Sequence, residues 1–189
     1  MKDDKLEFIP QNIQGVFLIK HKSFIDERGI FLRTYCKDTF IRSKVSFKIC
    51  QANLSINHKP FTLRGFHYQR DPFGEKKIIK CFRGRIFDIV VDIRKNSSTY
   101  GKWLSFDLNK SDNLSLCIPK GCANAFLTLE ENTIIHYYSN QNYNFSHQGG
   151  IRYNDSFFNF KWVKKPIIIS EQDKNWPDFN IKNSKGKRQ

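Results

Sequence analysis

The segment Leu63–Gln69, with the sequence LRGFHYQ, places a histidine among aromatic residues and close to several cations. His67 follows Arg64 and precedes Lys76 and Lys77. An imidazole titrates near neutral pH, so it can take up and return a proton, and neighbouring cations can hold an anionic substrate. A single histidine near apolar residues is also commonly a packed structural residue. This segment alone therefore leaves both interpretations open.

The elements that must position these residues are mostly short apolar segments, several of which alternate apolar and polar residues as half-buried strands do. The predicted strands are Val16–Ile19, Lys77–Phe82, Arg85–Ile93, Trp103–Leu108, Leu114–Ile118, Ala125–Leu129 and Thr133–Tyr138. Turn-forming residues between them are spaced for antiparallel hairpins, which predicts an all-β sandwich or small barrel. One short helix is expected over Asp38–Val45, with Asp38 as its N-cap.

The length and composition predict one domain. A chain of 189 residues lies in the size range of single domains, about 100–200 residues, and 18 Phe, 7 Tyr and 3 Trp supply a bulky core. No internal linker or repeat interrupts it. From about residue 180 the chain is basic, and we expect this tail to be solvated and flexible.

The charge, the cysteines and the N-terminus limit the function classes. A formal net charge of +14 attracts anions, so nucleic acid, acidic membranes and phosphorylated metabolites are all candidate partners. The 5 cysteines are odd in number and form no CxxC pair, which fits a reducing compartment and indicates neither a disulfide framework nor a zinc site. Without an apolar leader or a membrane-length apolar stretch, the sequence predicts a cytoplasmic protein.

Residues 118–126, with the sequence IPKGCANAF, resemble the second motif of the cupin superfamily, P-x-G-x-x-H, with Asn124 in place of the histidine ligand. His67 is followed by Tyr68 and Gln69, so the first cupin motif also lacks its metal-binding pair. Divalent transition metals need several imidazole or carboxylate ligands. The resemblance therefore predicts a cupin-like jelly-roll barrel with a few short peripheral helices and no metal.

Over roughly residues 8–178 the chain is similar to the dTDP-4-keto-6-deoxyglucose 3,5-epimerases and their sugar-nucleotide relatives. The matching stretches are Asp26–Gly29, Gln51 with Asn53, Leu63–Gln69, Gly84–Arg94, Ser98–Trp103, Ile118–Gly121, Tyr153–Asp155 and Ser170–Asp173. Their number and order make a chance resemblance improbable.

The resemblance implies proton transfer beside a ketone, without a cofactor. A 4-keto group acidifies the hydrogens on C3 and C5 of a sugar, because the carbanion left behind is delocalised as an enolate. The family roles fall on His67 as base, Asp173 as its carboxylate partner, Tyr137 as proton donor from the opposite face and Lys77 as the cation beside the ketone oxygen.

The same resemblance implies a binding site for a nucleoside diphosphate and a homodimer. Arg28 and Arg64 match residues that contact the diphosphate, a role suited to guanidinium groups. Tyr143 matches an aromatic residue that stacks on the nucleobase. Gln51 and Asn53 match a polar strand that helps to hold the nucleotide after crossing into a neighbouring subunit, so a homodimer with strand exchange is expected.

Four positions depart from the family pattern, and all are expected at or near the ligand. Asn124 replaces a histidine, Arg33 and Gln148 replace glutamates, and Gln172 replaces a lysine. With the acid and the base kept, these changes predict the same proton chemistry on a substrate other than the ordinary rhamnose precursor. A guanosine-diphosphate-linked 4-keto heptose or hexose of capsule or lipopolysaccharide synthesis is the expected variant, with inversion at C3, C5 or both.

Three other functions remain as alternatives. A sugar-nucleotide 3,4-ketoisomerase would use a similar histidine base but would move the carbonyl. A basic β-barrel could bind nucleic acid, although we recognise no RNP, KH or zinc signature. An inactive relative could bind the sugar nucleotide without converting it.

Overall fold

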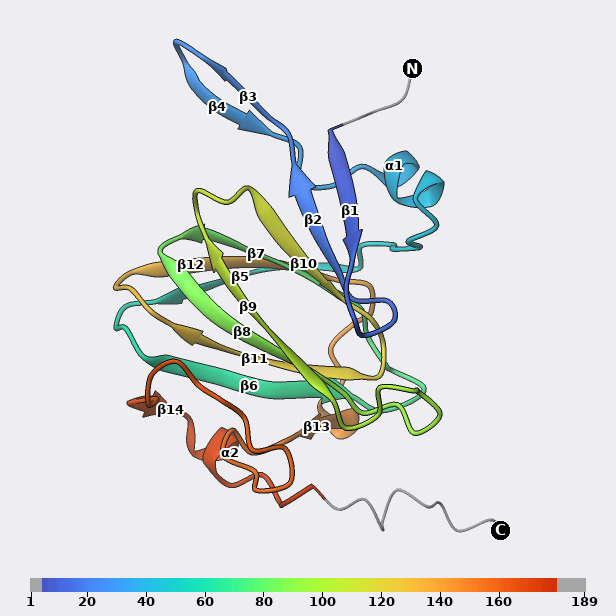
Figure 1. The fold of residues 1–189 in the computed structure, drawn as a ribbon, viewed down its shortest axis with the longest axis vertical. Helices are drawn as coiled ribbons and strands as arrows, with labels where there is room; N and C mark the ends of the chain where they lie inside the picture. Colours follow the sequence, from blue (N-terminus) through green and yellow to red (C-terminus); the bar gives the residue numbers. More distant parts are fainter. Residues whose placement is uncertain (1–4, 180–189) are drawn as a thin grey trace.

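Two β-sheets lie face to face in the computed structural model, which describes residues 5–179 (Figure 1). The first sheet has the spatial order β1 (Leu6–Pro10), β2 (Phe17–His21), β10 (Leu114–Ile118), β7 (Lys77–Arg83), β12 (Thr133–Ser139) and β5 (Gln51–Asn57). The second has the order β13 (Gln148–Gly150), β6 (Thr62–Gln69), β11 (Cys122–Thr128), β8 (Arg85–Asp92) and β9 (Trp103–Asn109), and β14 (Ile168–Ile169) joins β6. Neighbouring strands are mostly far apart in sequence, so the chain crosses repeatedly between the sheets, as in a jelly roll. The predicted all-β, cupin-like fold is confirmed.

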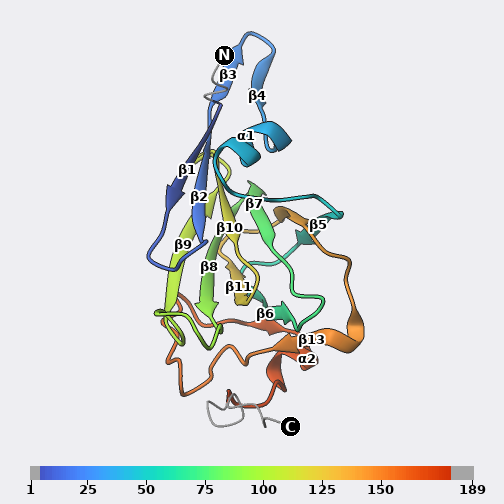
Figure 2. The same ribbon diagram turned by 90° about the vertical axis from the view of Figure 1, so that its right-hand side faces the viewer.

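The remaining elements are peripheral. A hairpin of β3 (Ser23–Asp26) and β4 (Gly29–Leu32) extends beyond both sheets (Figure 2). The helices are α1 (Lys37–Arg42), α2 (Glu171–Lys174) and the 3-10 turn η1 (Phe145–His147). The predicted basic tail from about residue 180 lies outside the described residues.

The predicted helix is present, but its predicted ends and N-cap were wrong. It spans Lys37–Arg42, and its N-cap is Cys36, so Asp38 lies in the first turn. A carboxylate there interacts favourably with the positive end of the helix dipole. The helix ends before Val45 because Lys44 takes a left-handed conformation with φ of 58°. Such a residue terminates a helix.

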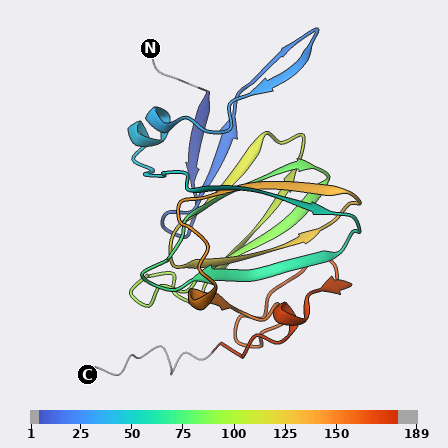
Figure 3. The same cartoon turned by 180° about the vertical axis from the view of Figure 1, so that it is seen from behind.

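Inward-facing strand residues pack part of the space between the sheets. Val90, Phe126 and Ile135 belong to the apolar cluster there. A second cluster, which includes Phe66 and Phe158, packs the segment after β13 onto the outer face of the second sheet. The two layers, seen from behind in Figure 3, thus support the side chains that project between them.

Candidate active site

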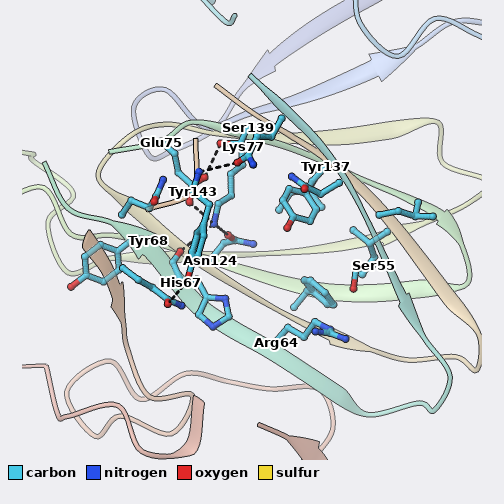
Figure 4. A pocket seen from close by; sticks show the side chains of 18 of the residues that line it. Ser55, Arg64, His67, Tyr68, Glu75, Lys77, Asn124, Tyr137, Ser139 and Tyr143 are labelled. Carbon is cyan, nitrogen blue, oxygen red and sulfur yellow. Dashed lines mark hydrogen bonds and ion pairs between the residues drawn. The ribbon is translucent and has the colours of Figure 1, made fainter. Parts of the chain in front are cut away.

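A pocket of about 580 Å³ is lined by residues of both sheets (Figure 4). The first sheet contributes β5, β7 and β12, and the second contributes β6, β11 and β13. Most of the predicted site residues line it: His67, Lys77, Tyr137, Gln51, Asn53, Arg64, Asn124, Tyr143 and Gln148. The fold therefore brings together residues that are scattered over about a hundred positions of sequence.

His67 pairs with a carboxylate at one side of this pocket. Its Nε2 lies 2.6 Å from Oδ1 of Asp173, and its side chain is 35% exposed whereas that of Asp173 is 4% exposed. Asp173 lies on α2, where the hydroxyl of the N-cap Ser170 accepts a hydrogen bond from the Asp173 amide at 3.1 Å. The pairing fixes the direction in which the imidazole faces the pocket.

The surroundings of Asp173 keep it charged. Burial alone raises the pKa of this carboxyl, but the hydrogen bonds from His67, the Gly65 amide and the Trp176 indole together lower it below its ordinary value. The absence of a side chain at Gly65 lets β6 pass close to β11, because a Cβ there would lie 2.5 Å from the carbonyl oxygen of Asn124. A carboxylate that stays ionised can stabilise the imidazolium formed when His67 takes a proton.

Lys77 extends into the pocket from β7 and is held by three acceptors. Its Nζ lies 3.2 Å from Oε1 of Glu75, 3.4 Å from the His67 carbonyl oxygen and 3.5 Å from Oδ1 of Asn124. The other carboxylate oxygen of Glu75 accepts a hydrogen bond from the Ser139 hydroxyl at 2.8 Å. The ammonium group is therefore fixed beside the backbone of His67 and the Asn124 amide, where it can stabilise negative charge on a substrate oxygen.

Tyr137 faces the same space from the first sheet, which also carries Lys77 and lies opposite the sheet of His67. It lies on β12, opposite Ile79 of β7 and Asn53 of β5. Burial, together with the negative charge of Glu75, raises the pKa of the Tyr137 phenol, and the nearby Arg64 opposes this shift. The phenol is therefore protonated at neutral pH and can serve as a proton donor.

The polar residues around these groups divide between two ends of the pocket. Arg64 lies at one end, where its Nε donates to Oδ1 of Asn57 at 2.8 Å. At the other end the Tyr143 hydroxyl donates to Oε1 of Gln148 at 2.8 Å, and the Tyr143 amide donates to Oε1 of Gln51 at 3.0 Å. Tyr143 is exposed, so one face of its ring is available to a ligand.

Four residues with predicted roles lie outside the pocket lining: Asp173, which is buried behind His67, and Arg28, Arg33 and Gln172. Arg28 is in the turn of the β3–β4 hairpin, where it pairs with Asp26 at 2.6 Å. Arg33 follows the same hairpin, and its carbonyl oxygen accepts a hydrogen bond from His21. Gln172 is exposed on α2, but its side chain donates to Gln148 at 3.3 Å and so lies beside the pocket.

Two carboxyl residues of the site were missed by the sequence analysis. Glu75 contacts Lys77. The sequence feature that could have indicated this pair is an acidic residue two positions before a basic one at the start of a predicted strand. Asp88 accepts a hydrogen bond from Asn124 at 3.2 Å, and its signal was a charged residue within the apolar run Arg85–Ile93. In both cases the pattern was visible, but nothing in the sequence showed which partner would lie opposite.

Within residues 5–179, no cluster of three or more His, Cys, Asp or Glu side chains has an arrangement that could hold a metal ion. In this same part of the chain, the helices lack the length and apolar character that a membrane crossing requires.

Comparison with known proteins places this chain in a family. Residues 10–180 match the family model described as dTDP-4-dehydrorhamnose 3,5-epimerase. The chain is 34% identical to the dTDP-4-dehydrorhamnose 3,5-epimerase of Sinorhizobium fredii over 177 residues, which cover 93% of this chain and 91% of that protein.

Solved structures agree with this match. The dTDP-4-dehydrorhamnose 3,5-epimerase of Bacillus anthracis, with TDP and pyrophosphate bound, superposes with a TM-score of 0.89 at 31% identity and covers 92% of this chain and 99% of its own. ChmJ, a 3'-monoepimerase of Streptomyces bikiniensis in complex with dTDP-quinovose, gives a TM-score of 0.83 at 27% identity and covers 89% of this chain and 86% of its own. The chain belongs to the dTDP-4-dehydrorhamnose 3,5-epimerase family.

Proposed function

We propose that the protein inverts C3, C5 or both carbons of a nucleoside-diphosphate 4-keto sugar by proton abstraction and reprotonation through an enolate. The observation that carries this proposal is the placement of the base and the acid. His67 projects from β6 of one sheet and Tyr137 from β12 of the other, so a sugar ring between the sheets has one group on each face. Inversion at carbon needs this arrangement, because the proton must leave from one face and return to the other.

Each proton can be followed through the proposed reaction. The imidazole of His67 takes the proton from the carbon beside the ketone, and Asp173 stabilises the resulting imidazolium at 2.6 Å. The negative charge moves to the ketone oxygen as the enolate forms. The positive charge of Lys77 then stabilises that oxygen. Tyr137 then gives its proton to the carbon from the opposite face. Solvent returns a proton to the phenolate and removes one from His67.

The enzyme class is that of the family, an isomerase that acts as an epimerase. The 3,4-ketoisomerase alternative needs a proton returned at the former carbonyl carbon. The opposed pair of His67 and Tyr137 favours inversion at one carbon instead.

The sugar is the finer part of the proposal. Relatives and solved neighbours are named for dTDP-linked sugars, so a dTDP-4-keto-6-deoxy sugar is the first substrate to test. Asn124 and Gln148, which depart from the family pattern, both line the pocket and support a different sugar. We retain a guanosine-diphosphate-linked 4-keto heptose of capsule or lipopolysaccharide synthesis as the variant substrate.

Proton NMR in D2O tests both the reaction and the substrate. The protein is mixed with thymidine- and guanosine-diphosphate 4-keto sugars, and the C3 and C5 proton signals are followed. We expect loss of one or both signals for at least one sugar, which identifies the carbon inverted. Unchanged signals across the whole panel would contradict the proposed function.

A homodimer with exchanged elements is also part of the proposal. However, Gln51 and Asn53, the residues expected to cross into a neighbouring subunit, line the pocket of their own chain, so the proposed exchanged element is the β3–β4 hairpin. The β3–β4 hairpin carries Phe24, Ile25, Ile30 and Phe31, all exposed in the single chain. Covering this apolar surface with a second copy would stabilise it. In such a dimer the hairpin and the segment after it could bring Arg28 and Arg33 toward the partner's pocket.

A further inference from the structure

Asp88 is a carboxyl group inside the barrel with no solvent contact. It is 0% exposed and lies on β8 between Ile86 and Val90, which belong to the apolar cluster between the sheets. One of its oxygens accepts a hydrogen bond from Nδ2 of Asn124 at 3.2 Å, whereas Oδ1 has no hydrogen-bond partner among the described residues. Burying a carboxyl group without full hydrogen bonding destabilises the folded state, so a functional reason for Asp88 at this position is expected.

Asn124 connects this buried group to the pocket. Its side chain is 7% exposed and lines the pocket, with Oδ1 toward the Lys77 ammonium at 3.5 Å and Nδ2 toward Asp88. An ammonium group only donates hydrogen bonds, so the atom that faces Lys77 must be the amide oxygen. The amide nitrogen then points into the barrel and needs an acceptor there. Asp88 supplies it.

We infer that Asp88 is a positioning residue for the proposed epimerase site, which fixes the Asn124 amide with its oxygen toward Lys77 and the pocket. This inference rests on the proposed function for its effect on catalysis but not for its geometry. Without an acceptor at position 88, the amide can rotate and present its nitrogen, a donor, to the Lys77 cation. That arrangement would displace the cation from its place beside His67.

The inference requires an acceptor at position 88, not a negative charge. Burial raises the pKa of Asp88 well above its ordinary value, although the Asn124 hydrogen bond and the positive charge of Lys77 oppose that shift. A neutral carboxyl still accepts a hydrogen bond through its carbonyl oxygen. An amide in the same place can do so as well, which makes Asp88→Asn the conservative variant and Asp88→Leu the disruptive one.

The first experiment measures hydrogen exchange of the Asn124 side-chain amide by nitrogen-15 NMR, with the signal assigned by its loss in Asn124→Asp. We expect slow exchange in the wild-type protein and in Asp88→Asn, and fast exchange in Asp88→Leu. Fast exchange in the wild-type protein would overturn the inference whatever the catalytic activity. The wild-type result decides even if Asp88→Leu does not fold.

The second experiment measures kcat and KM for the sugar that the wild-type protein converts. Asp88→Leu should lower kcat about tenfold and leave KM within about twofold, because Lys77 stabilises charge only in the transition state. Asp88→Asn should recover most of that loss. Wild-type kcat in folded Asp88→Leu, or an equal loss in Asp88→Asn, would overturn the inference.

Asp92 provides the matched control. It is also 0% exposed on β8, but its oxygens accept hydrogen bonds from Arg94, Ser97 and Thr99, away from the pocket. Asp92→Leu should lower the unfolding temperature without the kcat loss of Asp88→Leu. An equal kcat loss in folded Asp92→Leu would mean that general destabilisation, and not positioning, explains the effect of Asp88→Leu.

Discussion

His67 depends on a carboxylate that lies 106 residues away in sequence and 2.6 Å away in space. Removing the charge of that partner should weaken the base, because the imidazolium formed during the reaction would lose its stabilising neighbour. We expect Asp173→Asn to lower kcat about 100-fold, in the range typical of general base catalysis. Steady-state kinetics with the converted sugar measures this loss.

Glu171 is the matched control for that variant, since it lies on the same short helix but is exposed and pairs with Lys174 at 2.6 Å. Glu171→Gln should retain wild-type kcat. If Asp173→Asn also retains it while both variants remain folded, Asp173 has no part in the reaction.

At the scale of elements, His21 joins β2 to two other parts of the chain. Its Nδ1 donates to the Arg33 carbonyl at 2.8 Å, and its Nε2 accepts from the Ser115 hydroxyl of β10 at 2.7 Å. Burial lowers the pKa of His21 from 6.5 to about 4, assisted by the charge of Lys80 and opposed by the Arg33 carbonyl. The folded state therefore keeps this imidazole neutral where the unfolded chain would protonate it.

This shift predicts a pH-dependent stability. Between pH 6.5 and about 4 the unfolded state binds a proton at His21 that the folded state does not, so stability falls as the pH falls through this window. The loss should reach about 3 kcal/mol. Urea unfolding at several pH values measures it, and His21→Gln should flatten the dependence. His58→Gln, at an exposed position, should leave the slope of stability against pH as in the wild-type protein. If His21→Gln also keeps the wild-type slope, the pH dependence does not come from His21.

The elements show which parts of the fold could be predicted from the sequence. The apolar runs that became β7, β8, β9, β10 and β12 were predicted nearly to their ends, because their burial leaves an apolar pattern. The strand β6 was not predicted as such, because Arg64, His67 and Gln69 interrupt its apolar residues. The hairpin of β3 and β4 was also missed, since its apolar residues are exposed and show no burial pattern.

The candidate site could also be predicted only in part. His67 could be singled out from its own segment, but Asp173, Tyr137 and Lys77 were assigned through the family resemblance, because their proximity depends on the packing of the two sheets. Asp88 was missed since the sequence does not show that Asn124 would lie opposite it.

For the whole molecule, the exposed hairpin predicts self-association. Ile25 is 73% exposed at the hairpin, and we expect Ile25→Lys to convert a dimer into a monomer, because the charge would be buried at the interface. Sedimentation equilibrium measures the mass of each variant. Ile167, equally exposed at 73% but outside the hairpin, is the matched control, and Ile167→Lys should remain dimeric. A monomeric wild-type protein would rule out the proposed dimer.

The opposed positions of His67 and Tyr137 are tested most directly by comparing deuterium uptake with inversion in the same NMR experiment. In D2O the wild-type protein should exchange a proton beside the ketone and form the inverted sugar. Tyr137→Phe should still exchange that proton through His67 but should return it to the same face, so exchange would occur without inversion. His67→Asn should show neither. Inversion by Tyr137→Phe at the wild-type rate, or exchange by His67→Asn at the wild-type rate, would contradict the two-sided mechanism.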